Sequence, residues 1–466
     1  MVLLLAGVGP ASAQAPAEPD SVDVAVPHEF DGAGNSAWGP ISDAADTTSF
    51  RPEHPGLSLW EYPVAGLWWV IKLPFAILNW GFKAVVGWWG DIPFYDTIAR
   101  WLSRLPEFGV KVRADWTPAS GFRYGVNLYE HRLFGGNLHM QYWHAGGGRG
   151  DLVNTGSTRV FAGDRTSFDL VASYHRRGAE RYFGIGPDSD RDDEGFFTNR
   201  MVWFGGSAQR LFPRNFGAVA KVLYSDVSSY GPRHSERFDS IEEVFADRLP
   251  LGYGETSTGM SYEFELRHDD TGTPGRGVHG GLRRFMVGYF HPTSGYGFDF
   301  MHYRVVLEQF VGGKQPAGRQ LAVKGFWSWL DTGDGDVHFQ RLLTNHDADA
   351  FRGYHDFRWR DRGIAGVTVE YRYPVWDYGQ VAGGLGMDGY VFWDTGQVFS
   401  DHSLLKLDSL THSLGMGIRL VSAKDFLVRG EIAGSKEDII ARLSVSQLFQ
   451  RDKGGVYHGR VPIPMR

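Results

Sequence analysis

The residues best placed to do chemistry are four ionisable side chains that lie close together in the sequence. Glu370, Arg372, Asp388 and Asp394 share one parity along two segments in which apolar and polar residues alternate. Alternation places residues of one parity on one face of a strand, so these side chains share a face. The preceding loop carries Phe351-Arg352-Gly353-Tyr354. Carboxylates that face a loop arginine favour a loop pinned inside a hollow structure, because guanidinium binds carboxylate in a bidentate manner.

Other chemistries have little support in the sequence. The 17 histidines include no His-x-x-x-His or His-x-His pair on a predicted helix, so we expect no metal site. No Gly-x-Ser-x-Gly elbow follows a buried strand. The glycine-rich run at 146–150 opens no helix, as a phosphate-binding loop would. We therefore expect no catalytic residues, no cofactor and no enzymatic activity.

The composition favours a transmembrane barrel. The 466 residues include 62 glycines, and aromatic residues make up 15%. A chain rich in glycine and aromatic residues but without a long apolar run is typical of membrane strands, in which only every second residue faces lipid. The net charge of −7 and the lack of a basic stripe exclude nucleic acid as a partner. The absence of cysteine fits a chain that crosses an oxidising periplasm.

The N-terminal region predicts three segments. Residues 1–13 form an apolar run that ends in Ala11-Ser12-Ala13, the pattern of a signal peptide. Residues 14–57 are rich in Ala, Pro, Asp, Ser and Gly and predict a disordered linker. Residues 58–106 carry seven tryptophans with interspersed lysines, which predicts an amphipathic helical segment at the periplasmic membrane surface. A packed helical hairpin against the barrel is the alternative for this segment.

From residue 107 to 450 the pattern changes to a period of two residues. About sixteen alternating segments, mostly of 9–12 residues, predict an all-β fold, a transmembrane antiparallel barrel. Long connections are predicted at 145–156, 177–196, 227–255 and 331–360, and short turns near 163–164, 213–215 and 422–424. Long loops at one end and short turns at the other are typical of such barrels. Residues 451–466 form a polar C-terminal tail.

Several motifs resemble those of the BamA/TamA superfamily, the bacterial surface antigen family. They are FRGY at 351–354, EYRYP at 370–374, FWDTG at 392–396, YFGIG at 182–186 and HDDTGTPGRG at 268–277. The resemblance implies that the FRGY loop enters the lumen between the eleventh and twelfth strands, where Arg352 meets Asp394 and Glu370. Arg372 and Gly396 belong to the same lumen site. The alternation of the sequence independently turns both carboxylates inward.

The resemblance also implies a function and a location. It predicts a bacterial outer-membrane protein that assists the insertion or translocation of proteins, or of lipid. A seam between the first and last strands, around Val110 and Leu443, would open laterally. Expected partners are outer-membrane lipid and lipopolysaccharide, client outer-membrane proteins, and a periplasmic partner supplying the POTRA modules that the sequence does not reveal. The alternative is a porin or transporter-like channel whose FRGY loop constricts the pore.

Overall fold

The computed structural model describes most of the region from residue 108 to residue 444. The predicted signal peptide, linker, Trp-rich segment and C-terminal tail lie outside the described residues, as do the turn at 422–424 and residues 272–277 of the HDDTGTPGRG motif. The described ranges are 108–117, 121–134, 137–163, 165–233, 236–271, 280–295, 297–312, 319–333, 335–346, 351–377, 386–421 and 426–444.

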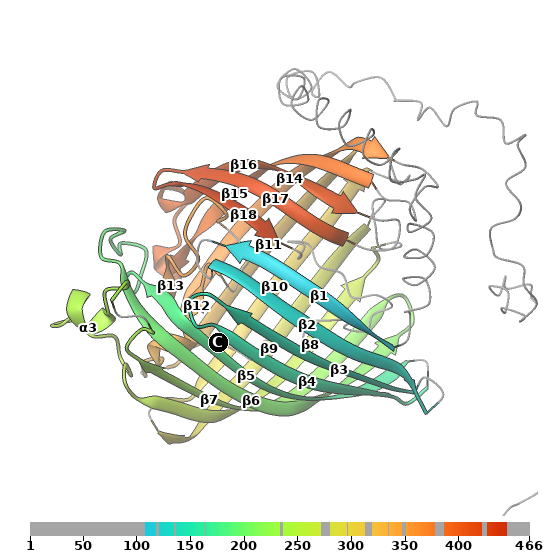
Figure 1. Cartoon of the computed structure of the whole chain (residues 1–466), viewed down its shortest axis with the longest axis horizontal. Coiled ribbons are helices and arrows are strands. Elements are labelled where there is room, and N and C mark those ends of the chain that lie inside the picture. The colour runs from blue at the N-terminus through green and yellow to red at the C-terminus, as the bar shows by residue number, and fades with distance from the viewer. Residues whose placement is uncertain are drawn as a thin grey trace, which may run out of the picture. The chain divides into compact units, whose positions relative to one another are not determined.

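In these ranges sixteen antiparallel strands form a closed barrel (Figure 1). Each strand pairs with its neighbours in the chain, and β1 pairs with β18 to close the ring. The prediction of an all-β barrel of about sixteen strands is confirmed. The barrel strands are β1 (Phe108–Thr117), β2 (Gly121–Leu133), β3 (Leu138–Gly147), β4 (Leu152–Phe161), β5 (Thr166–Tyr182), β6 (Gly195–Phe212), β7 (Phe216–Tyr230), β8 (Thr256–Asp269), β9 (Gly280–Gly295), β10 (Phe300–Gly312), β11 (Gln320–Asp331), β14 (Gly363–Asp377), β15 (Gly386–Phe399), β16 (Thr411–Val421), β17 (Phe426–Ser435) and β18 (Ile439–Ser444).

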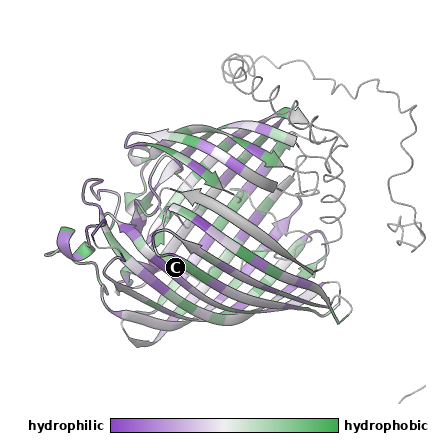
Figure 2. Cartoon of the chain, viewed as in Figure 1, coloured by the Kyte–Doolittle hydropathy of each residue, from purple (hydrophilic) through white to green (hydrophobic). Residues whose placement is uncertain are grey.

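Hydrophilic and hydrophobic residues alternate along the coloured strands of Figure 2. This alternation separates a polar lumen from an apolar outer wall. On β8, Glu263 and Glu265 are buried in the lumen, whereas Tyr262, Phe264 and Leu266 are exposed on the outside. Exposed aromatic and aliphatic side chains on a closed barrel are those that a bilayer would cover. Among the described residues, no helix is long and apolar enough to cross a membrane.

Two of the predicted long connections, 145–156 and 177–196, are shorter in the structure. Residues 145–156 form no long loop, because β3 ends at Gly147 and β4 begins at Leu152. The amide of Gly147 donates to the oxygen of Asp151 and closes a tight turn. Glycine lacks a side chain but keeps both main-chain hydrogen-bonding groups, so the glycine run continues the ladder instead of ending it. Strands β5 and β6 are also longer than predicted, with 17 and 18 residues.

The long connection between β11 and β14, residues 332–362, is called the plug loop below. It contains a 3₁₀ turn, η2 (Phe339–Arg341), and a two-stranded ladder of β12 (Leu343–Thr344) and β13 (Arg360–Asp361). Phe339, Phe351 and Tyr354 are almost fully buried in one hydrophobic cluster. The other short elements are α3 (Ile241–Val244), η4 (His402–Leu404) and η5 (Leu407–Ser409). Ser240 and Glu243 form a capping box at the start of α3.

Candidate functional site

The candidate site is centred on Arg352, which lies in the plug loop and is 2% exposed. Its Nε and Nη2 donate to the two carboxylate oxygens of Asp394 on β15 at 3.0 and 2.7 Å. The backbone N–H of Arg352 also donates to Asp394, at 3.0 Å. Nη1 donates to Glu370 on β14 at 3.1 Å. Asp394 therefore fixes both the main chain and the side chain of the loop, in the bidentate geometry that makes such pairs strong.

Two further groups complete the surroundings of Arg352, and neither was predicted. Glu431 on β17 lies 3.5 Å from Nη1 and accepts a hydrogen bond from Tyr390 at 2.9 Å. The guanidinium also lies over the ring of Phe392, 3.3 Å from its centroid. Phe392 shares the parity of Asp394 within the FWDTG motif, and Glu431 shares that of Arg429. The alternation of the sequence therefore places both side chains on the lumen face, and this is the signal by which they could have been predicted.

Electrostatics favours a permanently charged Arg352. Burial on its own lowers the pKa of this guanidinium, but Asp394, Glu431 and Glu370 more than offset burial and hold the pKa above its usual value. The guanidinium and three carboxylates form a buried network, and removing Arg352 would leave the carboxylates without the cation that they share.

The remaining predicted residues lie in the same wall but not all of them touch the loop. Arg372 donates from Nε to Glu370 at 2.7 Å, so Glu370 bridges two arginines. Asp388 pairs instead with Arg419 on β16, at 2.9 Å. The wall beside the plug loop is therefore a ladder of ion pairs, of which Asp394 and Glu370 make the direct contacts with Arg352.

Two predicted glycines allow the loop and the wall to approach closely. A Cβ added to Gly353 would lie 2.7 Å from Cβ of Ser413 and 2.8 Å from the oxygen of Gly434. A Cβ added to Gly396 would lie 2.8 Å from Cζ of Phe351. Real Cβ atoms do not approach other atoms so closely without a shift of the surrounding structure, which is why glycine fits both positions.

The last barrel strand holds the plug loop from the other side. Arg442 on β18 donates to the main-chain oxygens of Arg352 and Tyr354, the latter at 2.9 Å, and to Asp356 at 3.2 Å. Although burial opposes the charged form, Arg442 and His346 hold the pKa of Asp356 below its usual range.

The turn that precedes β18 makes two more side-chain contacts with the plug loop, one of them an ion pair. Glu437 accepts from Arg358 at 2.8 Å, and Asp438 lies 3.2 Å from His355. Together with Arg442, these contacts attach the β17–β18 hairpin to the plug loop at several points.

The plug loop is also attached to the side of the lumen opposite β18. Arg341 of η2 donates to the Ser257 side chain at 2.8 Å and the Ser225 side chain at 3.1 Å, and it lies over the ring of Phe290. Burial lowers the pKa of Arg341 to about 9. Arg360 pairs with Glu180 on β5. The plug loop therefore spans the lumen from β18 to the wall formed by β5, β7 and β8.

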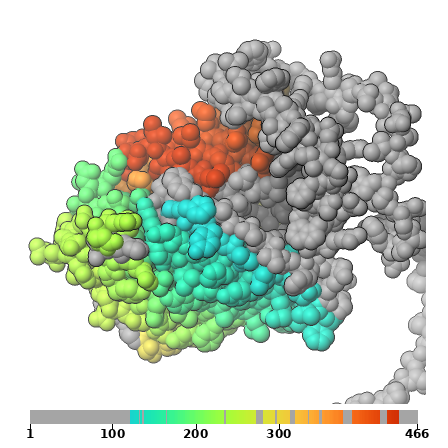
Figure 3. Space-filling view, viewed as in Figure 1, coloured from blue at the N-terminus to red at the C-terminus, as the bar shows by residue number. Residues whose placement is uncertain are grey.

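The barrel closes where β1 meets β18. Among the described residues, one register pair, Trp116 with Leu443, joins β1 to β18. Strand β1 pairs with β2 along its whole length, from Phe108–Glu130 to Thr117–Gly121. Figure 1 shows β1 in cyan and β18 in red, and Figure 3 shows the strands that follow β1, in cyan, on the same face of the molecule as the C-terminal strands, in red. This junction of β1 and β18 is called the seam below.

The described residues contain no group of three or more histidine, aspartate or glutamate side chains that could hold a metal ion. The arrangement is instead one of ion pairs that position a loop.

The protein is a closed sixteen-stranded barrel whose lumen holds an arginine-anchored plug loop. No protein-family model matches the chain, and no curated protein matches its sequence. Among solved structures, BamA from Haemophilus ducreyi lacking POTRA domains 1–3 is similar with a TM-score of 0.51 and 11% identity, over 72% of this chain and 69% of that chain.

Two further solved structures are similar to this chain. CdiB from Acinetobacter baumannii matches with a TM-score of 0.44 and 11% identity, over 72% of this chain and 58% of that chain. CdiB from Escherichia coli matches with a TM-score of 0.47 and 12% identity, over 73% of this chain and 63% of that chain. At 11% identity the similarity to BamA is a similarity of fold, and it confirms the predicted resemblance in the fold of the barrel.

Proposed function

We propose that this chain is an outer-membrane barrel of the BamA/TamA type that assists the insertion or translocation of proteins, or of lipid, through its seam. The observation that carries the proposal is that the two strands of the seam are held by different parts of the protein. Strand β1 pairs with β2 along its whole length. Strand β18 is held by Arg442 and its hairpin turn against the plug loop.

The physical basis of the mechanism is the unpaired strand edge. A main-chain N–H or C=O without a partner costs several kcal/mol in hydrocarbon, so an open seam favours any strand that can pair with it. An incoming chain with strand propensity would add to the edge of β1 by main-chain hydrogen bonding. Because the plug loop anchors β18, separation at the seam would move β1 and β2 away from a fixed β18.

The plug loop has two roles in this proposal. It fills the lumen between β18 and the opposite wall, and Arg352 keeps it there through Asp394 and Glu370. The passage for a client is then the seam and not the lumen. Expected partners are client outer-membrane proteins, outer-membrane lipid and a periplasmic protein that supplies POTRA modules in trans.

The test is a folding assay in liposomes that contain the full chain. An unfolded small outer-membrane barrel is added, and its folded fraction is followed by heat-modifiability on gels. We expect folding to be at least several-fold faster than in liposomes without the protein. Equal folding rates, together with a large open conductance in planar bilayers, would instead favour the channel function.

A further inference from the structure

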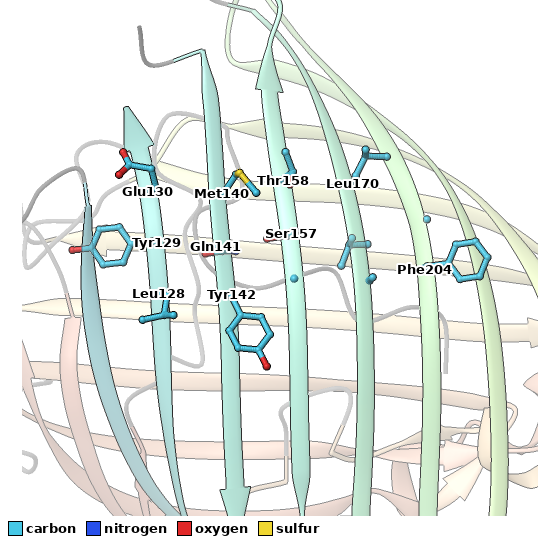
Figure 4. Close-up of a pocket in the computed structure, with 14 residues that line it drawn as sticks. Leu128, Tyr129, Glu130, Met140, Gln141, Tyr142, Ser157, Thr158, Leu170 and Phe204 are labelled. Atoms are coloured by element: carbon cyan, nitrogen blue, oxygen red, sulfur yellow. The ribbon is translucent and has the colours of Figure 1, made fainter. Parts of the chain in front are cut away.

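The outer wall of the barrel carries an apolar groove on β2 to β6, with a volume of about 780 Å³. Its lower row of outward residues is Glu130, Met140, Thr158 and Leu170, which are cross-strand neighbours. Its upper row is Leu128, Tyr142, Gly156, Ala172 and Phe204. Figure 4 shows the labelled side chains on these neighbouring strands; the lower row, nearer the short turns of the barrel, is drawn at the top of the view, and the upper row, nearer the long loops, is drawn below it.

Small residues form the floor of the groove and large ones its sides. A Cβ added to Gly156 would meet no atom within 4 Å, and Ala172 beside it is exposed. Leu170 and Phe204, at one side, are 65% and 54% exposed. A groove of this shape on a lipid-facing wall fits an acyl chain, which would bury the exposed apolar area.

A polar row follows directly above the groove on the same strands. His144 and Asn154 face outward and share a hydrogen bond of 2.8 Å, and Tyr142 donates to Asn154 at 2.9 Å. Such a row marks the level at which the hydrocarbon of the bilayer ends.

Two arginines lie in the next row up. Arg176 on β5 and Arg200 on β6 are direct register partners, and both belong to the outward parity. Like charges directly opposite each other destabilise a sheet unless an anion lies between them. Arg176 donates to the oxygen of Gly150 at 3.1 Å, and the side chain of Arg233 packs over the α-carbon of the same glycine. Three arginines, Arg176, Arg200 and Arg233, therefore lie close together at this end of the strands.

One carboxylate lies in this cluster. Asp226 accepts from Arg200 at 2.7 Å and from Thr258 at 3.1 Å, so it offsets part of the positive charge. The cluster keeps a net positive charge of about two, from three arginines and one aspartate. The arginine row lies about 13 Å above the upper row of the groove, since four strand residues separate Arg176 from Ala172.

We propose that Arg176, Arg200 and Arg233 bind the phosphate of a lipopolysaccharide molecule, one acyl chain of which lies in the groove between Tyr142 and Phe204. Guanidinium groups are suited to phosphate because they donate two parallel hydrogen bonds. The cluster lies at the end of the barrel that bears the long loops, and in outer-membrane barrels this end faces outward. The inference rests on the proposed outer-membrane placement but not on the action of the seam.

The test uses the full chain, purified in mild detergent and titrated with lipid A, dephosphorylated lipid A and phosphatidylglycerol, with binding followed by native mass spectrometry. We expect the double variant Arg176→Gln/Arg200→Gln to bind lipid A at least tenfold more weakly. Gly156→Leu, which fills the groove, should weaken binding several-fold. Arg210→Gln is the matched control, because Arg210 also faces outward on β6 but lies at the opposite end of the strand.

Heat-modifiability shows that each variant is folded. Unchanged binding of lipid A by the double variant would overturn the proposal, as would equal binding of dephosphorylated lipid A. Equal binding of phosphatidylglycerol would overturn the choice of lipopolysaccharide. If the chain were absent from outer-membrane fractions, the proposed function itself would fail, and this outcome is separate from the binding result.

Discussion

Arg442 on the last barrel strand donates a hydrogen bond of 2.9 Å to the main-chain oxygen of Tyr354 in the plug loop. This contact joins the strand at the seam to the loop that fills the lumen. The plug loop and β18 therefore form one unit, while β1 and β2 form another. The seam, where these two units meet, is the place where we expect the barrel to open.

Removing this contact should loosen the plug loop. Glutamine at position 442 cannot reach the three oxygens that Arg442 binds, so we expect Arg442→Gln to raise single-channel conductance in planar bilayers and to expose the loop to protease. Arg191→Gln is the control, because Arg191 also pairs with the hairpin turn but is 44% exposed. An exposed pair contributes only about 0–1 kcal/mol. Equal behaviour of the two variants would contradict this role of Arg442.

Arg352 should matter more than any other residue of the plug loop. Arg352→Ala leaves Asp394, Glu370 and Glu431 buried without their shared cation, which costs roughly 3–5 kcal/mol when a buried pair is broken. We expect the loop to leave the wall while the barrel stays folded, and insertion activity to fall. Protease protection of the loop, heat-modifiability and the liposome assay measure the three effects. Unchanged protection and activity would rule out the anchoring role.

The alternation of the sequence was sufficient to predict which carboxylates face the lumen. Glu370 and Asp394 belong to strands with strict polar and apolar alternation, and one face of such a strand must avoid lipid. Arg352 lies in a loop whose sequence has no alternation of polar and apolar residues. Its partners could be predicted only from the resemblance of the motifs to those of a known family. The strand count could also be predicted, since a barrel wall repeats the same pattern in every strand.

Contacts that depend on closure of the barrel could not be predicted in the same way. Arg442 meets Tyr354 across 88 residues, and the pairing of β1 with β18 determines where Arg442 lies. The prediction of a long loop at 145–156 is wrong, because a glycine-rich composition does not show whether main-chain groups stay paired.

The close approach at Gly353 gives a steric test. A methyl group there would lie 2.7 Å from Cβ of Ser413, so we expect Gly353→Ala to displace the FRGY segment and weaken plug docking by about 1–3 kcal/mol. Gly325→Ala is the control, because a Cβ at Gly325 on β11 would meet no atom within 4 Å. Thermal melting in detergent and protease protection compare the two variants. A larger effect at Gly325 than at Gly353 would refute the packing argument.

Acid should weaken the attachment of the plug loop to the hairpin turn. Burial, with help from Arg181, Arg191 and Arg442, lowers the pKa of His355 to about 4, against the opposing effect of Asp438. In the unfolded chain histidine titrates near a pKa of about 6.5. The folded state therefore binds fewer protons, so this contribution to stability is complete above about pH 6.5 and is lost as the pH falls toward 4.

Protease protection of the plug loop, measured between pH 7 and pH 4, checks this expectation. His355→Asn removes the titrating ring, and its protection should change less over this range than that of the unaltered chain. Carboxylates elsewhere titrate in both proteins alike, so the difference between the two profiles isolates His355. Identical profiles would show that His355 does not contribute.

The most direct measurement of the central claim is a disulfide across the seam. The chain has no cysteine, so Trp116→Cys/Leu443→Cys introduces a single possible bond between register partners, whose α-carbons lie within disulfide range in an antiparallel pair. We predict that the oxidised protein loses its acceleration of folding in the liposome assay and that reduction restores it. Full activity of the oxidised, locked barrel would contradict lateral opening as the mechanism.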